Sequence, residues 1–591
     1  MQFSSRNGLI GFAALCSAAY LAFAVDVSSE IKSDAQLHAM TDEIARSKTL
    51  QLNSLDKPYF VSYSVSEADQ FVVSGSLGGI VGSIRNRARH PSVQVRVGSY
   101  ALDNTNSTFS PTPRLGLLPI DDDYDAIRTS FWLSTDGLYK AAADQITRKR
   151  NALRERADTE SVADFAPATP AQLILPPSKL TLDQNEWENK IRRLSGAFAK
   201  YPDVASSSVR LMALATTYRL ANSEGTLIRM PQDIADLQIR ASGLAPDGSP
   251  VWNHRFLTTF RPSDLPSDEQ LAREVEAIAS ETNALERAPL AAEYSGPVLF
   301  EQEAAAQMIA EVMADAARLR RKPVAQPDSN EGGFLESVWA SRLGTKVTPD
   351  WMTMIDDPSQ KQFQGARLAG YYPADDEGVI PKAVTLVEKG VLKAFLLSRE
   401  PVKSFDSSNG HGRLPGRYGS EAATIGNLFV QVDQTTPESQ MKARLIEKVK
   451  AAGLKYGILL RRLDFPSTAN VEELQGMARQ LQKSGYARTL SAPLLAYRVY
   501  PDGREELVRG LRFKEFSAKD LRDVALASDR PYVLNYLNNG SSFDFADVLS
   551  DATTSSVICP SLLFDSVDLD RSQDDLTKPP LVPPPPLTAQ K

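Results

Sequence analysis

One segment near the middle of the chain constrains the fold most: a short apolar strand that leads directly into an alanine-rich helix, residues 294–322. Val-Leu-Phe at 298–300 follows a Gly-Pro turn, and Glu301 and Glu303 place negative charge where a helix N-terminus favours it. Apolar residues then recur with i, i+3, i+4, i+7 spacing across 306–317, and a basic cluster follows. The pattern predicts a buried helix packed beside a strand.

The length and charge of the chain limit its architecture and its partners. At 591 residues it is too long for one hydrophobic core. Its 42% hydrophobic and 24% charged residues are typical of globular proteins, and its net charge of −7 argues against a nucleic-acid partner.

The first 24 residues have the pattern of a secretory signal peptide. Arg6 supplies the positive end, residues 9–20 the apolar run, and Ala22-Phe23-Ala24 a small-residue cleavage site. The apolar run is too short for a confident membrane anchor. We therefore expect an exported protein, periplasmic or extracellular, without stable membrane insertion. After cleavage Cys559 is the one remaining cysteine, so no internal disulfide is expected.

Breaks in the pattern divide the chain into expected domains. The N-terminal part begins with helical spacing, continues with alternating strands at 59–65 and 92–100, and ends in a polar helix. This order predicts an N-terminal α+β domain. A proline-rich linker precedes a middle domain, and the C-terminal part contains a meander and a closing strand pair at 556–568. The expected boundaries are a signal peptide at 1–24, the N-terminal domain at 25–156, a linker at 157–180, the middle domain at 181–288, the C-terminal domain at 289–570 and a proline-rich tail at 571–591.

The meander contains two turn signals. Glu388-Lys389-Gly390, between two runs rich in β-branched residues, predicts a tight hairpin. The acidic turn Asp375-Asp376-Glu377 lacks the spacing of a calcium loop, so we expect these side chains to be solvated. The predicted fold class is α+β: an N-terminal mixed α/β sheet domain followed by a large domain of curved antiparallel sheet with packed helices.

Several segments of this sequence resemble segments found in one protein family. The stretch GPVLFEQEAAAQMIAEVMADA, residues 296–316, is similar to the segment of TldD/PmbA metallopeptidases that carries HExxxH, in which two histidines bind zinc and the glutamate is the general base. On that motif the first histidine falls on Ala310, the glutamate on Glu311 and the second histidine on Asp315. Further phrases lie at 99–105, 222–226 and 354–397.

The resemblance implies a role without zinc. Catalytic zinc needs three protein ligands and an open position, and Ala310 has no donor atom. In this family a metal-binding member pairs with a homologous subunit that lacks the ligands, and the two enclose a cleft for unfolded peptides. This chain resembles the second kind, with Glu311 as a vestigial base. No cofactor is then expected here, and zinc is expected only in a catalytic partner.

A glycine-containing loop at 408–413 resembles a loop that lies near the active cleft in catalytic members. Asn409, His411, Arg413 and the downstream Asn427 are therefore candidates for peptide binding. An arginine can hold a carboxylate in two-point contact. A purely structural role for Arg413 remains the alternative.

Three functions remain open from the sequence. The first is the non-catalytic subunit of an exported peptidase, paired with a catalytic homologue. The second is an active hydrolase with a rearranged metal site, in which Glu311 is the base and Asp315 or His411 is recruited. The third is a homodimeric, non-enzymatic envelope protein that binds peptides.

Overall fold

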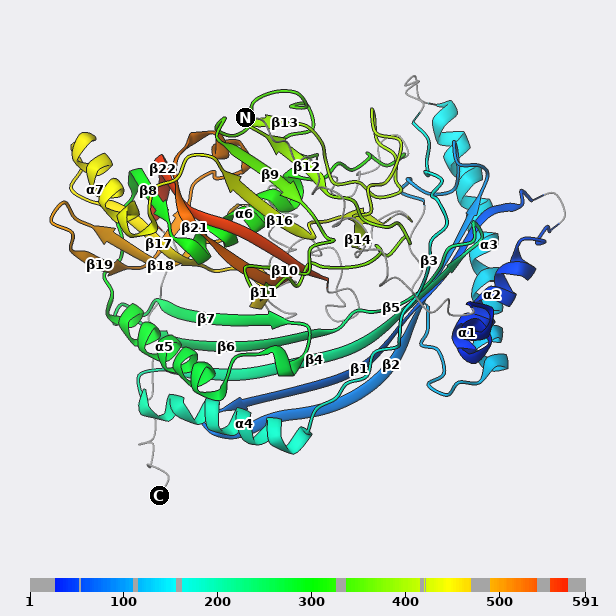
Figure 1. The fold of residues 1–591 in the computed structure, drawn as a ribbon, viewed down its shortest axis with the longest axis horizontal. Coiled ribbons are helices and arrows are strands. Elements are labelled where there is room, and N and C mark those ends of the chain that lie inside the picture. Colours follow the sequence, from blue (N-terminus) through cyan, green and yellow to red (C-terminus); the bar gives the residue numbers. More distant parts are fainter. Residues whose placement is uncertain are drawn as a thin grey trace, which may run out of the picture.

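The protein is described here from a computed structural model. It describes residues 27–52, 55–109, 115–155, 162–325, 336–414, 419, 421–468, 489–538 and 553–571. The expected signal peptide and nearly all of the proline-rich tail lie outside these residues. Two large sheets organise the described chain, and Figure 1 shows the first curving beneath the second. The predicted α+β class is confirmed.

The first sheet, here called the N-terminal sheet, is built from two separate parts of the chain. Its strands are β1 (Pro58–Ser76), β2 (Gly79–Val97), β3 (Gln172–Ile174), β4 (Ser206–Asn222), β5 (Leu227–Pro231), β6 (Ile234–Leu244) and β7 (Pro250–Thr259). The order is β2-β1-β4-β5-β3, and β6 and β7 continue from β4. β1 pairs antiparallel with β4 from Ser62↔Asn222 to Gly75↔Val209. The sheet therefore crosses the boundary expected between the N-terminal and middle domains, because strand pairing depends on long-range partners.

The strand β1 extends well beyond the strand expected at 59–65. Residues 66–69 interrupt the apolar alternation, yet they pair with β2 on one side and β4 on the other. Because both neighbours satisfy the backbone N–H and C=O groups, the polar stretch stays extended. The chain reverses at Leu77 and Gly78, both with positive φ.

Helices cover both ends of this sheet. Near one end lie α1 (Val27–Ser33), α2 (Ala35–Ser47) and α3 (Tyr124–Arg154), and near the other lie α4 (Gln184–Gly196), η1 (Ala197–Lys200), η2 (Pro262–Asp264) and α5 (Asp268–Arg287) (Figure 1). Ser267 and Gln270 form a capping box that begins α5. Trp187, Ile191, Leu271 and Val275 pack against the strands in one apolar cluster.

The second sheet, the C-terminal sheet, has eleven strands in the order β13-β12-β9-β16-β22-β8-β17-β18-β19, with β20 and β21 also paired to β22. They are β8 (Tyr294–Phe300), β9 (Met352–Asp356), β12 (Val384–Glu388), β13 (Val391–Leu392), β16 (Asn427–Val432), β17 (Gly457–Leu463), β18 (Pro493–Val499), β19 (Glu505–Val508), β20 (Leu511–Phe513), β21 (Val524–Leu537) and β22 (Thr554–Arg571). Short pairs β10 (Gln362–Phe363) with β11 (Ala366–Arg367), and β14 (Gly412–Leu414) with β15 (Ala422–Ala423), lie outside it.

The closing strand pair expected at 556–568 is instead the single strand β22. Within β22, Pro560 lies opposite Pro531 of β21 at a register shift. Neither proline has an N–H to place in the ladder, so the pairing continues through this point. The tight hairpin expected at Glu388-Lys389-Gly390 is confirmed: β12 pairs with β13, and Lys389 and Gly390 have positive φ.

The predicted central helix is confirmed as α6 (Gln302–Ala316). It is buried on nearly all sides, with Ala304, Met308, Ile309 and Met313 fully inside the main apolar cluster of the C-terminal sheet. The remaining helices are α7 (Met441–Ala451), η3 (Glu438–Gln440), η4 (Pro466–Thr468) and η5 (Ala518–Asp523). Within the described ranges, no helix is long and apolar enough to span a membrane.

Candidate functional site

The three positions aligned with HExxxH lie on α6, and each side chain contacts other residues of the protein. Ala310 is 2% exposed and belongs to the main apolar cluster. A carboxylate oxygen of Glu311 accepts the backbone N–H of Ser491 at 3.0 Å. Asp315 forms an ion pair of 2.6 Å with Arg318, one turn further along.

This donor set does not fit a zinc ion. The first ligand position carries a methyl group in an apolar environment, and Asp315 faces a guanidinium rather than open space. In the part of the chain that the structure describes, no group of three or more His, Cys, Asp or Glu side chains is arranged to hold a metal. Zinc sites need at least three such donors, so no chemical step through a metal is derived for this chain.

His411 is a buried bridging residue. Its side chain is 0% exposed, with Nδ1 2.9 Å from Asn409 Oδ1 and Nε2 3.1 Å from Asp356 Oδ1. Asp356 also accepts the backbone N–H of Gly426. Both ring nitrogens thus face protein oxygens, and the geometry gives His411 a positioning role rather than contact with a ligand.

Asn409 and Asn427 hold loops in place. Asn409 Nδ2 donates to the carbonyl of Phe395 at 2.8 Å, while its Oδ1 accepts the N–H of Leu397 at 2.9 Å. Asn427 Nδ2 donates to the carbonyls of Asp357 and Gln360. Pairs of this kind are typical of side chains that replace missing backbone partners in loops.

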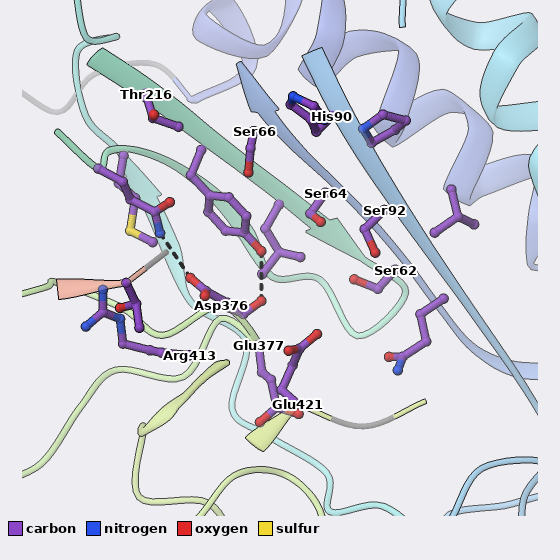
Figure 2. Close-up of a pocket in the computed structure, with 18 of the residues that line it drawn as sticks. Ser62, Ser64, Ser66, His90, Ser92, Thr216, Asp376, Glu377, Arg413 and Glu421 are labelled. Atoms are coloured by element: carbon purple, nitrogen blue, oxygen red, sulfur yellow. Dashed lines mark hydrogen bonds between the residues drawn. The ribbon is translucent and has the colours of Figure 1, made fainter. Parts of the chain in front are cut away.

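A large cavity of about 1530 Å³, here called the central cavity, lies between the N-terminal sheet and loops of the C-terminal domain. Its sheet wall includes a row of polar side chains, because alternate residues of each strand point to the same side. Figure 2 shows Ser62, Ser64 and Ser66 from β1, His90 and Ser92 from β2, and Thr216 from β4. Asp376, Glu377, Arg413 and Glu421 form part of the opposite wall.

Arg413 is the one predicted site residue among the described lining of this cavity. Strand β14 carries it, and its side chain is 8% exposed. Nη1 donates to the carbonyl of Thr554 at 3.0 Å, and the guanidinium carbon lies 4.2 Å from the ring centroid of Tyr372. Tyr372 is itself fixed, since its hydroxyl donates to the carbonyl of Gly410 at 2.8 Å.

The acidic turn at 375–377 is not solvated as expected from the sequence. Asp375 is fully buried and accepts the backbone N–H groups of Glu377, Val379 and Gly412. Burial raises the pKa of Asp375 well above its usual range and raises the pKa of Glu377 to about 7, although nearby Arg399 opposes the second shift. The turn is covered because the N-terminal sheet packs on it.

Sequence reasoning missed most of the residues that build the cavity. Phe165, in the expected linker, lies between two guanidinium groups, those of Arg96 at 3.7 Å and Arg399 at 3.9 Å from its ring centroid. Tyr218 of β4 donates its hydroxyl to the carbonyl of Asp376 at 2.8 Å. These residues come from distant segments, and the only signal for the wall was the serine alternation in β1.

The C-terminal domain matches a known family. Residues 293–472 match the family model described as the PmbA/TldA metallopeptidase C-terminal domain. A metalloprotease of Archaeoglobus fulgidus is 41% identical over 80 residues, covering 14% of this chain and 17% of that protein. A metalloprotease of Methanothermobacter thermautotrophicus is 29% identical over 210 residues, covering 34% and 41%. The chain thus spans less than half the length of the curated relatives it matches.

Solved structures extend the likeness to most of the fold. TldE from Thermococcus kodakarensis has a TM-score of 0.55 and 13% identity, covering 90% of this chain and all of that one. A Thermotoga maritima protein classed as a modulator of a DNA gyrase has a TM-score of 0.55 and 14% identity, covering 92% and 100%. At these identities the likeness establishes the fold alone.

The fold and the family domain define a metallopeptidase-like protein whose aligned zinc-ligand positions hold other residues. Residues 293–472 therefore carry a domain of the PmbA/TldA metallopeptidase family.

Proposed function

We propose that this chain is a non-catalytic TldD/PmbA-family subunit that binds peptide segments and pairs with a zinc-binding homologue, which performs the cleavage. The observation that carries the proposal is the environment of Ala310. At the first zinc-ligand position, Ala310 lies in the main apolar cluster of the C-terminal sheet. At the second position, the charge of Asp315 is neutralised by Arg318, 2.6 Å away.

Glu311 supports the same conclusion. A general base in a metallopeptidase acts on a water molecule bound to the metal. Here one carboxylate oxygen of Glu311 accepts the N–H of Ser491, in the segment that precedes β18. This contact favours a role in holding that segment against α6.

The central cavity supports peptide binding. Sites for small molecules are commonly about 300–1,000 Å³, so about 1530 Å³ leaves room for several peptide residues. The hydroxyl groups of Ser62, Ser64 and Ser66 offer donors and acceptors at the repeat of an extended strand. An extended peptide presents N–H and C=O groups with a similar repeat.

Export of the chain remains part of the proposal, supported by the pattern of residues 1–24. Expression of the full chain followed by fractionation and N-terminal sequencing tests it. We expect a mature product that starts near Val25 in the exported fraction. An uncleaved product retained inside the cell contradicts export.

Zinc content and peptidase activity test the central proposal. The purified chain is measured by plasma mass spectrometry, and cleavage of an unstructured peptide is followed with the chain alone and with a homologue that carries intact HExxxH. We expect much less than one zinc per chain, no cleavage alone, and co-elution with the homologue. One zinc per isolated chain together with chelator-sensitive cleavage contradicts the proposal.

A matched pair of variants separates this proposal from an active hydrolase. Glu311→Gln in this chain should leave cleavage by the mixture unchanged, whereas the same replacement in the HExxxH glutamate of the homologue should abolish it. Glu301→Gln, at the half-buried N-cap of the same helix, controls for general effects on α6. Loss of cleavage with Glu311→Gln but not with Glu301→Gln favours the rearranged-site alternative.

A further inference from the structure

One arginine in the central cavity has no carboxylate partner among the described residues. Three other arginines that line the cavity are paired: Arg399 with Glu224 at 2.7 Å, Arg367 with Asp264 at 2.8 Å, and Arg261 with Asp233 at 3.5 Å. Arg413 instead has the Thr554 carbonyl and the Tyr372 ring. Its Nε is buried without a hydrogen-bond partner.

The burial of Arg413 makes this arrangement incomplete. A charged group that is 92% removed from water is unfavourable unless it is paired and hydrogen-bonded. One neutral carbonyl and one aromatic ring offset only part of that penalty. A negatively charged group from outside the chain would complete the set of partners.

One remaining donor of Arg413 suits a carboxylate. With Nη1 committed to Thr554 and Nε closed off from solvent, Nη2 is left to donate a charge-assisted hydrogen bond to a carboxylate. The side chain is also held in advance of binding. Tyr372 is tied to Gly410, and β14 pairs with β15 through Gly412↔Ala423.

We infer that Arg413 anchors a carboxylate of the ligand that enters the central cavity. This inference rests on the proposed peptide-binding function and specifies its ligand: a peptide that presents a C-terminal or side-chain carboxylate. Lys361, whose Nζ lies 5.0 Å from the ring centroid of Tyr371, adds positive charge to the same lining.

Acidic residues elsewhere in the cavity direct the carboxylate to Arg413. Asp376, Glu377 and Glu421 also line it. Asp376 accepts the side-chain N–H of Gln232 at 3.0 Å, which keeps this carboxylate on the cavity wall. Like charges repel at short range, so a ligand carboxylate is disfavoured near these residues and favoured at the arginine.

Peptide binding measured by fluorescence anisotropy tests the inference. Three labelled hexapeptides of one neutral sequence are compared: a free C-terminal carboxylate, a C-terminal amide, and an amide with one internal glutamate. We expect at least one carboxylate peptide to bind about tenfold more tightly than the neutral amide, which corresponds to loss of one charge-assisted contact. Preference for the first identifies the C-terminus as the source, and preference for the third identifies a side chain.

Variants connect that preference to one residue. Arg413→Gln should remove this preference, and Arg413→Lys should restore part of it because an ammonium group keeps the charge but not the shape and reach of the guanidinium group. Arg367→Gln, at an exposed and already paired arginine of the same cavity, should leave it unchanged. Melting curves of each variant establish that it is folded.

Three results overturn the inference: equal binding of all three peptides, a preference that survives in Arg413→Gln, or no peptide binding at all. The proposed function fails by a different measurement, zinc and cleavage in the isolated chain. A zinc-free chain that binds neutral and acidic peptides equally would keep the proposed function and remove Arg413 as the anchor.

Discussion

Arg399 Nη2 donates to Glu224 Oε1 at 2.7 Å, and this buried ion pair joins the two sheets of the molecule. Glu224 lies in the turn between β4 and β5, and Arg399 follows β13 in the C-terminal domain. The same guanidinium donates to the carbonyl of Ala166 and stacks on Phe165. Three distant chain segments therefore meet at one side chain.

Arg399→Ala should destabilise the protein by about 3–5 kcal/mol, because Glu224 would keep a buried charge without its cation. Guanidinium unfolding followed by circular dichroism measures the loss. The control is Arg444→Ala, whose exposed pair with Glu447 should contribute less than about 1 kcal/mol. Equal midpoints for the two variants would contradict a bridging role for Arg399.

Gly378→Ala should also loosen the contact between the sheets. Gly378 has a φ of +82°, and a Cβ there would lie 2.6 Å from Thr226 Cγ2 and 2.9 Å from Leu220 Cδ2. We expect a loss of about 2–4 kcal/mol from left-handed backbone strain and overpacking together. Gly503→Ala is the matched control: φ is +88°, but a Cβ would meet no described atom within 4 Å, so backbone strain of about 1 kcal/mol acts alone.

Stability should decrease with rising pH through Glu286. Burial, and secondarily Asp203, raises the pKa of Glu286 to about 7, against about 4.5 without these effects. The carboxyl is 6% exposed and lies directly over Gly243, where a Cβ would be 1.7 Å from Oε1. The folded protein holds this proton more tightly than the unfolded chain does, so protonation of Glu286 stabilises the fold. This stabilisation is complete below about pH 4.5 and is lost as pH rises through about 7.

Glu286→Gln should remove that pH dependence. Relative to the native chain, the variant should gain about 1–2 kcal/mol between pH 5 and pH 8, allowing for solvent near the carboxyl. Thermal melts in matched buffers measure the difference. Glu276→Gln, at an exposed position of the same helix that pairs with Lys200, should show no such trend. A constant difference across this pH range would rule out Glu286 as the titrating group.

His411→Ala should act through stability rather than through peptide contact. The substitution removes one buried hydrogen-bond partner from Asp356 and one from Asn409, and we expect a loss of about 2–4 kcal/mol. At a temperature where the variant is folded, its peptide affinity should stay within about threefold of the native value. His90→Ala, in the cavity wall, is the comparison and should change affinity with less loss of stability. A selective loss of binding in His411→Ala would place His411 at the ligand.

Local patterns were sufficient for elements whose signals are local. The strand and helix at 294–316 and the hairpin at Lys389-Gly390 were predicted, because apolar period, end charges and turn chemistry act within a few residues. The extent of β1 and β22 was not, since their continuation depends on pairing with strands far away in the chain.

The candidate site divides in the same way. The sequence indicated a glycine-containing loop at residues 408–413, but it could not tell which of its side chains face the cavity. Hydrogen bonds to Asp356, Phe395 and Gln360 hold the side chains of His411, Asn409 and Asn427, respectively, inside the protein. Tyr372 and Thr554 decide that Arg413 lines the cavity. The absence of zinc from this chain and its export remain predictions.

By itself, the sequence determined that this chain has two histidine positions of a zinc motif replaced by Ala310 and Asp315, and that a strand–helix unit carries them. The tertiary structure alone decided that one sheet unites residues 58–97 with 172–259, and that the cavity lies between this sheet and the C-terminal loops. The physical reason is range: side-chain chemistry and helix period are local, whereas burial and ion pairing depend on which distant segments pack together.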